Sequence, residues 1–244
     1  MEQMGIRINK YLSEAGVCSR READRMVEEG AITIDGKVAV MGDRILEGQK
    51  VAVHGKIVSK EEELILLAFN KPVGIVCTSA KSEKDNIVDY IHYPKRIYPI
   101  GRLDKDSQGL ILLTNNGDIV NRIMRSGNKH EKEYEVKVNK PVTAQFLAGL
   151  QKGVPLEELE VVTRPCKAQQ TGEMEFRMII TQGYNRQIRR MCEYFGYKVV
   201  KLKRTRILNI ELGSLKKGRY RNVTEEEQKE LYRIIQHSSN TTVK

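Results

Sequence analysis

The most informative stretch of the chain is Gly101-Arg102-Leu103-Asp104-Lys105-Asp106-Ser107-Gln108-Gly109-Leu110, which runs into the apolar segment 111–113. Two glycines and several polar side chains directly before an apolar run indicate a tight loop that leads into a strand. A plain turn in which Asp104 or Asp106 caps its own backbone is one interpretation. A calcium loop is rejected, because its twelfth position would be Asn115 instead of a bidentate glutamate. The chemistry of this loop therefore depends on the segments around it.

A basic segment lies further along the chain: Gly183-Tyr184-Asn185-Arg186-Gln187-Ile188-Arg189-Arg190-Met191-Cys192. Its apolar residues recur at helical spacing, and its three arginines cannot all be buried without partners, since an isolated buried charge is very costly. From 183 to 206 there are eight basic side chains and one acidic one. A solvated helix face is the alternative, but this excess favours a phosphate-binding surface.

A third segment, His130-Glu131-Lys132-Glu133-Tyr134-Glu135-Val136-Lys137-Val138, alternates like a strand. If Tyr134 shares a face with Val136 and Val138, its ring points inward. It is then either an ordinary core tyrosine or part of a site, and the strand pattern leaves both open.

The second part of the chain predicts an α+β fold, in which a largely antiparallel, mixed β-sheet is flanked by helices. The order of the strands is not derivable from the pattern. The predicted strands are 64–69, 110–114, 131–138, 174–181 and 197–210, and the predicted helices are 118–125, 143–151, 185–195 and 224–236.

The first 60 residues predict a separate small α/β domain. A short amphipathic helix begins near Ile6, and Ser19 with Glu22 three residues later forms a capping-box pattern for a second helix. Asp35-Gly36 between two short apolar runs is a hairpin signal, and a third strand follows at 50–53. The polar segment 58–63 is a linker candidate. We therefore expect domains at 1–60 and 61–237 and a polar tail at 238–244.

Composition narrows the class of protein. The formal net charge is +10, from 42 basic and 32 acidic side chains, but residues 1–60 carry 10 basic and 9 acidic ones, so the surplus lies in the second part. A basic surplus favours a polyanionic partner. The sequence shows no signal peptide and no apolar run long enough to span a membrane. Four scattered cysteines and four scattered histidines indicate reduced thiols, a cytoplasmic location and no metal cluster.

Together these segments resemble the signature set of bacterial rRNA pseudouridine synthases, in the branch of small-subunit synthase A and large-subunit synthases B, E and F. Segments 104–110 and 128–134 are most similar to the F-type synthases. The N-terminal part resembles the alpha-L RNA-binding domain shared with ribosomal small-subunit protein four. Beyond the three segments above, the matching stretches are Asn70-Lys71-Pro72-Val73-Gly74-Ile75-Val76, Pro99-Ile100, Arg7-Ile8-Asn9-Lys10-Tyr11-Leu12 and Cys18-Ser19-Arg20-Arg21-Glu22-Ala23-Asp24.

The resemblance implies an enzyme that isomerises a uridine to pseudouridine without metal or other cofactor. Asp104 matches the catalytic aspartate of the family, and Arg189 matches the arginine that holds this carboxylate charged. Tyr134 matches the tyrosine that stacks on the target base. A base in a duplex is unreachable, so the uridine must flip out, and Arg102 matches a residue that fills the vacated space.

The resemblance also implies the partners. We expect a monomer that binds large-subunit ribosomal RNA, with tRNA as a possible second substrate and no membrane. The alternative is a non-catalytic RNA-binding or ribosome-assembly protein with the same N-terminal domain. The candidate RNA-binding residues, apart from Arg102, are Arg7, Lys10, Arg20, Arg21, Arg25, Asn185, Arg186, Arg190, Lys203 and Arg204.

Overall fold

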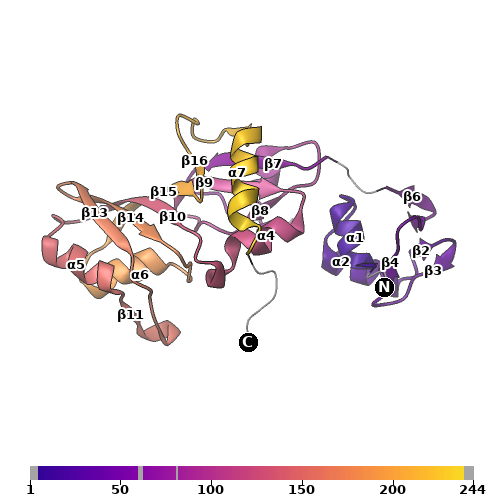
Figure 1. The fold of residues 1–244 in the computed structure, drawn as a ribbon, viewed down its shortest axis with the longest axis horizontal. Coiled ribbons are helices and arrows are strands. Elements are labelled where there is room, and N and C mark those ends of the chain that lie inside the picture. The colour runs from indigo at the N-terminus through magenta and orange to yellow at the C-terminus, as the bar shows by residue number, and fades with distance from the viewer. Residues whose placement is uncertain (1–4, 60–62, 81, 239–244) are drawn as a thin grey trace. The chain divides into compact units, whose positions relative to one another are not determined.

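The computed structural model describes residues 5–59, 63–80 and 82–238 (Figure 1). The chain forms two compact units. The first comprises Met1–Ile65 with the short segments Tyr93–Ile97 and Asn115–Gly117, and the second comprises Leu66–His92, Tyr98–Thr114 and Asp118–Lys244. No helix within the described ranges is both long and apolar enough to cross a membrane.

The first unit begins with two helices, α1 (Ile8–Glu14) and α2 (Arg20–Glu28). Helix α2 starts as predicted. The Ser19 hydroxyl accepts a hydrogen bond from the Glu22 amide, and the Glu22 carboxylate accepts one from the Ser19 amide. A four-stranded sheet follows in the order β3-β2-β5-β6, and β1 pairs with β4. The strands are β1 (Ile6–Arg7), β2 (Ile32–Ile34), β3 (Lys37–Val38), β4 (Arg44–Ile45), β5 (Val51–Val53) and β6 (Lys56–Val58).

Both helices of this unit turn an apolar face to the sheet. Leu12 of α1, Ala23 of α2 and Ile32 of β2 are fully buried in one cluster. The hairpin between β2 and β3 turns at Asp35 and Gly36, both of which have positive φ angles, as the predicted turn requires. The polar side of α2 therefore remains outward, where a polyanion can reach it.

The second unit is built on one large sheet with the strand order β13-β14-β10-β15-β9-β7-β17. Strand β9 runs parallel to β15, whereas the other described neighbours along this order are antiparallel. The prediction of an α+β fold with a mainly antiparallel sheet is confirmed. The strands are β7 (Leu66–Lys71), β8 (Tyr98–Ile100), β9 (Gln108–Thr114), β10 (Lys132–Val138), β13 (Lys167–Gly172), β14 (Glu175–Ile180), β15 (Val199–Ile207), β16 (Ile210–Glu211) and β17 (Tyr220–Asn222).

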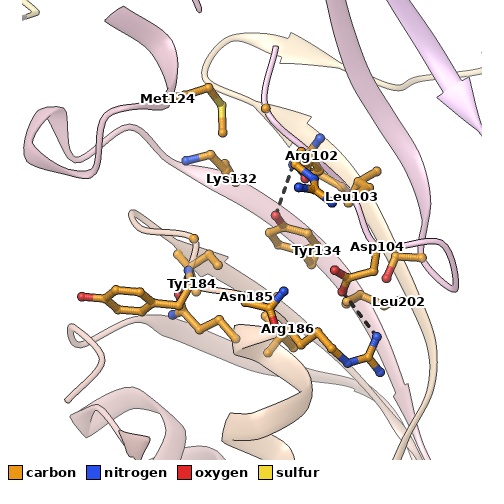
Figure 2. A pocket seen from close by; sticks show the side chains of 17 residues that line it. Arg102, Leu103, Asp104, Met124, Lys132, Tyr134, Tyr184, Asn185, Arg186 and Leu202 are labelled. Atoms are coloured by element: carbon orange, nitrogen blue, oxygen red, sulfur yellow. Dashed lines mark hydrogen bonds and ion pairs between the residues drawn. The ribbon is translucent and has the colours of Figure 1, made fainter. Parts of the chain in front are cut away.

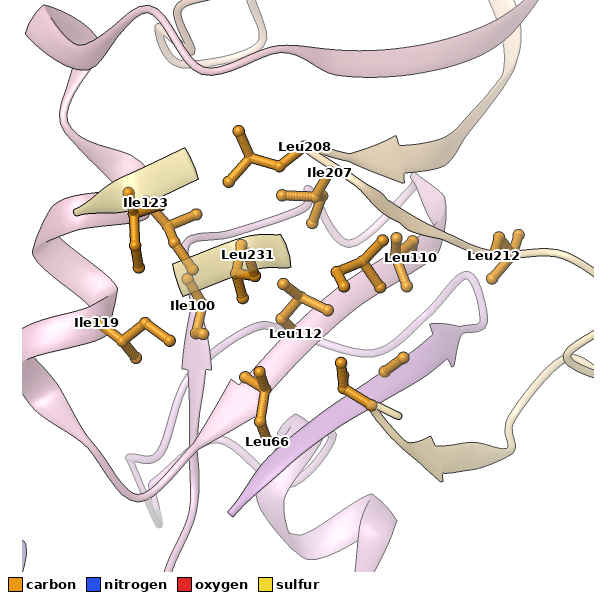
Figure 3. Packing of buried hydrophobic residues seen from close by; sticks show 14 residues of the cluster. Leu66, Ile100, Leu110, Leu112, Ile119, Ile123, Ile207, Leu208, Leu212 and Leu231 are labelled. Carbon is orange, nitrogen blue, oxygen red and sulfur yellow. The ribbon is translucent and has the colours of Figure 1, made fainter. Parts of the chain in front are cut away.

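The helices of this unit cover two regions of the sheet. Helices α4 (Gly117–Met124) and α7 (Glu225–Ile235) pack against β7, β8 and β9 through Ile123, Leu231 and Leu112, which are fully buried (Figure 3). At the other end, α5 (Ala144–Lys152) and α6 (Gln187–Tyr194) enclose an aromatic cluster in which Phe146 stacks on Tyr197 with ring centroids 3.8 Å apart. The sheet between these regions carries three of the predicted site residues, Tyr134 on β10 and Lys203 and Arg204 on β15.

A few elements were not predicted. The extended pattern at 197–210 is two strands, because the chain turns at Leu208, which has a φ of 54°. The short pieces α3 (Ile87–Ile91), β8, β13 and β17 also lacked a clear signal. Two further strands, β11 (Pro155–Leu156) and β12 (Val161–Val162), form a small hairpin of their own. Residues 60–62 of the predicted linker and 239–244 of the polar tail lie outside the described residues.

Candidate active site

A cavity of about 400 Å³ opens where the predicted loop meets the sheet and the start of α6 (Figure 2). It brings together segments that lie up to a hundred residues apart in the sequence. Its lining residues are Gly101, Arg102, Leu103, Asp104, Ser107, Met124, Lys132, Tyr134, Ile180, Gly183, Tyr184, Asn185, Arg186, Gln187, Ile188, Leu202 and Arg204.

The loop between β8 and β9 presents Asp104 to this cavity. Leu103 is buried, and its amide donates to the thiol sulfur of Cys77 over 3.3 Å. The Ser107 amide donates to the Asp104 carbonyl over 3.0 Å, which closes the turn. The side chain of Asp104 stays 30% exposed. The loop is therefore anchored on both sides of a carboxylate that a substrate can reach.

Two features hold the far end of this loop. The fully buried Lys71 ammonium donates to the backbone carbonyls of Pro72 and Ser107, over 2.8 and 2.7 Å. At Gly109 the backbone of β9 approaches β15 so closely that a Cβ would lie 2.7 Å from the Arg204 amide nitrogen. Only glycine fits such an approach, and its φ of 104° also favours glycine.

Arg186 connects the second basic segment to this loop. It precedes α6 with a left-handed backbone, φ 51° and ψ 29°, and its guanidinium binds the Asp106 carboxylate through two donors at 3.1 and 3.2 Å. The same guanidinium lies 3.9 Å from Asp104. Partial burial opposes ionisation of Asp106, but the Arg186 hydrogen bond and the nearby Arg189 charge hold its pKa below the ordinary value.

The expected ion pair between Arg189 and Asp104 is wrong. Arg189 is buried beneath the loop, where Nη2 donates to the Asp106 carbonyl at 3.1 Å and to Ser107 Oγ at 3.3 Å. Nη2 also lies 3.2 Å from the Asp106 carboxylate, and Nη1 donates to the Val199 carbonyl at 3.1 Å. The reason is that α6 begins at Gln187, so Arg189 faces the base of the loop while Arg186 projects toward Asp104.

Tyr134 and Arg204 form the floor of the cavity. They lie opposite each other on β10 and β15, and both are at least nine-tenths buried. The Arg204 guanidinium donates from Nε to the Leu110 carbonyl at 2.7 Å and from Nη1 to the Tyr134 hydroxyl at 3.4 Å. Its Nη2 is buried without a hydrogen-bond partner among the described residues. The Tyr134 ring thus lies beside a cation with an unused donor.

Lys132 was not predicted as a site residue, although it lies two residues before Tyr134 on the same face of β10. It is 4% exposed and lines the cavity, and its ammonium makes one long contact, 3.5 Å to the His130 carbonyl. Burial, with a smaller effect of the Arg204 charge, lowers the pKa of Lys132 to about 8. The strand alternation itself was the missed signal, because it places a lysine on an apolar face.

The remaining predicted residues lie elsewhere. Arg190 pairs with Glu158 and donates to the Asn185 carbonyl, and Lys203 pairs with Glu135 across β10 and β15. In the first unit the arginines proposed to bind RNA are exposed on or beside α1 and α2, whereas Lys10 lies 3.5 Å from Glu14. Those arginines are Arg7, Arg20, Arg21 and Arg25. Within the described ranges, no three His, Cys, Asp or Glu side chains gather as a metal site.

An anchored aspartate and an adjacent tyrosine line one cavity, and a separate N-terminal unit exposes several arginines, an arrangement that fits an enzyme acting on RNA. Residues 65–194 match the family model described as RNA pseudouridylate synthase, and residues 6–51 match the S4 domain. The chain belongs to the RNA pseudouridylate synthase family. The alternative of a non-catalytic RNA-binding protein is therefore set aside.

Individual relatives agree with this assignment. The chain is 54% identical over 235 residues to the dual-specificity RNA pseudouridine synthase RluF of Salmonella typhi, covering 96% of this chain and 81% of that protein. It is 36% identical to the ribosomal large subunit pseudouridine synthase B of Bacillus subtilis, covering 96% and 98% of the two chains. A crystal structure of a pseudouridylate synthase superposes with a TM-score of 0.68 at 29% identity, covering 93% and 99%. The predicted resemblance, including its F-type branch, is confirmed.

Proposed function

We propose that this pseudouridine synthase isomerises one uridine in large-subunit ribosomal RNA and accepts a tRNA as a second substrate. The relatives named as dual-specificity synthases at 52–54% identity support two substrates, and the relative named as a large-subunit synthase supports the ribosomal one. The scattered cysteines, all free in the described chain, support action in the reducing cytoplasm. We also propose that the protein acts as a monomer.

The observation that carries the proposal is a partly exposed carboxylate, Asp104, that lines the same cavity as the buried ring of Tyr134. In this proposal the target uridine flips out of its helix and its uracil stacks on Tyr134. Asp104 then acts at the sugar, either by attack on C1′ or by assisting proton removal. Arg102, exposed at the rim, fills the space that the base leaves.

Arg189 has a positioning role in this scheme. It does not contact Asp104 but holds the backbone and hydroxyl of the next residues, Asp106 and Ser107. Arg186 supplies the guanidinium on the Asp104 side. Together the two arginines fix a carboxylate that works only if its orientation toward the sugar is constant.

Mapping of pseudouridines tests the substrate assignment. RNA from cells that lack this protein is expected to lose pseudouridine at one large-subunit position and in one or more tRNAs. Purified protein added to that RNA is expected to restore both. A loss confined to small-subunit rRNA, or no loss in either RNA, contradicts the assignment.

The S4 domain is proposed to add affinity for RNA without taking part in chemistry. Arg20 and Arg21 are exposed at the start of α2, and phosphate contacts position a protein without supplying catalysis. We expect the double variant Arg20→Gln/Arg21→Gln to bind RNA more weakly, with a salt-dependence slope lower by roughly 1.5, since each lost phosphate contact reduces it by about 0.7–0.9.

A matched variant controls for net charge. Lys37→Gln/Lys56→Gln removes two exposed cations from β3 and β6 of the same domain. Filter binding across a salt series is expected to show a normal slope for this control, and single-turnover rates at saturating enzyme are expected to be normal for both proteins. If the two double variants had equal salt-dependence slopes, the arginines of α2 would not belong to the RNA-binding surface.

A further inference from the structure

Two buried cations share the inner end of the cavity without a carboxylate partner. Lys132 and Arg204 come from the adjacent strands β10 and β15, and they are 4% and 1% exposed. Within the described chain the Lys132 ammonium makes no ion pair, and Arg204 Nη2 makes no hydrogen bond. The Lys132 ammonium has only the 3.5 Å hydrogen bond to the His130 carbonyl there. Burying a charge without a counter-ion, or a donor without an acceptor, is costly. A fold selected for stability alone would carry an apolar side chain at position 132.

We infer that Lys132, assisted by Arg204, binds the uracil base after it detaches and stabilises the negative charge on its oxygens. This inference rests on the proposed roles of Asp104 and Tyr134. It makes Lys132 a catalytic residue, because its ammonium would touch the reacting base.

The electron count of the reaction requires such a group. When the C1′–N1 bond breaks, its electron pair stays on uracil, and the resulting anion is delocalised over N1, O2, C5 and O4. The electron-poor sugar is held by the Asp104 carboxylate, or it loses a proton and regains it later. The base then rotates and C5 uses its electron pair to bond to C1′, while any bond from C1′ to Asp104 breaks. The C5 proton leaves, and N1 takes up a proton. No atom is gained or lost, so the protein must stabilise only the transient charge.

The geometry favours the base over a backbone phosphate. Lys132 precedes Tyr134 by two residues on the same strand face, and Arg204 Nη1 reaches the Tyr134 hydroxyl. Lys132 therefore lines the same cavity as the ring on which the base is proposed to stack (Figure 2), and Arg204 contacts the hydroxyl of that ring. A backbone phosphate is charged throughout the reaction. The exposed Arg102 and Arg186 at the rim of the cavity are better placed to bind it than the buried Lys132 and Arg204. Buried, poorly hydrated donors act most strongly on charge that develops only during the reaction.

The charge state of Lys132 adds a pH signature. Its pKa of about 8, lowered mainly by burial, leaves the amine protonated at pH 7. Activity that depends on the ammonium is therefore retained below pH 8 and falls as the pH rises through the folded pKa. The other charged or titratable groups that face Lys132 or line its cavity come from four places. They are Arg204 on β15, Tyr134 on β10 with His130 just before that strand, Arg102 and Asp104 on the loop, and Tyr184 and Arg186 before α6.

The experiment compares Lys132→Met and Lys132→Arg in single-turnover reactions at saturating enzyme. We expect Lys132→Met to lose roughly 10²–10³-fold in rate, with RNA affinity within about twofold of normal. Lys132→Arg, which keeps a charge at every accessible pH, is expected to recover much of the rate and to lack the decline above pH 8.

Thermal stability distinguishes this role from a structural one. Because an unpaired buried ammonium is removed, Lys132→Met is expected to raise the melting temperature at pH 7 by about 2–4 °C. In the unfolded chain the lysine keeps its proton up to its ordinary pKa of 10.5, whereas the folded protein loses it near pH 8. The destabilisation of the wild type by the buried charge therefore decreases as the pH rises from 8 toward 10.5, and the difference in melting temperature between the two proteins decreases with it. A fall in melting temperature that parallels the loss of rate would overturn the inference.

A substrate with 5-fluorouridine at the target site tests the charge on the base directly. Fluorine stabilises the uracil anion, so the rate penalty of Lys132→Met on cleavage of the C1′–N1 bond is expected to shrink several-fold. An undiminished penalty, or weaker RNA binding with a normal rate, would assign Lys132 to a phosphate instead.

Asp104→Asn is measured in parallel. If this variant stays fully active, the proposed function itself fails, whereas an inactive Asp104→Asn beside a Lys132→Met with a normal rate overturns only this inference.

Discussion

Asp104→Asn is expected to abolish isomerisation and to leave the fold intact. The amide has the shape of the carboxylate but cannot carry its charge, so it can neither attack C1′ nor accept a proton. We expect the single-turnover rate to fall by at least about 10³-fold. The only ion-pair contact of Asp104 in the described chain is 3.9 Å long to a half-exposed Arg186, so stability is expected to change by less than about 1 kcal/mol.

The neighbouring Asp106 is the matched control. Its side chain is 47% exposed, its carboxylate forms ion pairs with Arg186 and Arg189, and it does not line the cavity. Asp106→Asn is therefore expected to weaken the anchoring of the loop and to reduce the rate far less than Asp104→Asn. The measurement is pseudouridine yield at saturating enzyme together with a thermal melt of each protein. Full activity of folded Asp104→Asn protein would contradict the catalytic assignment.

The local pattern of the sequence predicted most helices and strands but not their arrangement. The capping box at Ser19 and the alternation around Tyr134 act within a few residues, and both appear in the structure as predicted. The parallel pairing of β9 with β15 joins Gly109 to Arg204 across almost a hundred residues, and no local signal encodes it. Short strands such as β17 exist only because β7 offers them an edge.

In the site, too, the local sequence pattern did not predict which side chains lie next to each other. The helix that carries Arg189 was predicted to begin at 185 and begins at Gln187. Residue 186 was expected inside the helix, but its backbone is left-handed, with a φ of 51°, which redirects its side chain. Arg186 therefore lies outside the helix and approaches Asp104, and Arg189 reaches Ser107 instead. Lys132, in contrast, was readable from alternation alone, since a lysine in register with buried residues needs an explanation.

Arg189→Met is expected to lower both stability and catalysis, although Arg189 does not contact Asp104. Its guanidinium donates to the Asp106 carbonyl, the Ser107 hydroxyl and the Val199 carbonyl. Methionine leaves these acceptors without their donor in a buried place, which costs about 2–3 kcal/mol in the free energy of unfolding. The freed loop displaces the Asp104 carboxylate, and a misplacement of about 1 Å costs roughly 10²-fold in rate.

The acid side of the stability profile gives an independent readout. In the native protein Arg189 helps hold the pKa of Asp106 below its ordinary value. Such a group stabilises the fold above its unfolded pKa, and this contribution is lost as the pH falls through the folded pKa. The difference in unfolding free energy between wild type and Arg189→Met is therefore expected to narrow when the pH is lowered below about 4. A constant difference would show that the Asp106 pair contributes nothing.

Arg190→Met is the control for Arg189→Met, because it removes the same charge one residue later. Arg190 pairs with the exposed Glu158, away from the cavity, so its loss is expected to cost less than about 1 kcal/mol and to leave single-turnover chemistry nearly intact. RNA binding is expected to weaken, since a surface cation is lost. Arg189→Lys should lie between wild type and Arg189→Met, because one ammonium cannot donate at once to the loop and to β15. Normal chemistry in Arg189→Met, with the loss appearing in Arg190→Met instead, would show that the wrong arginine anchors the catalytic loop.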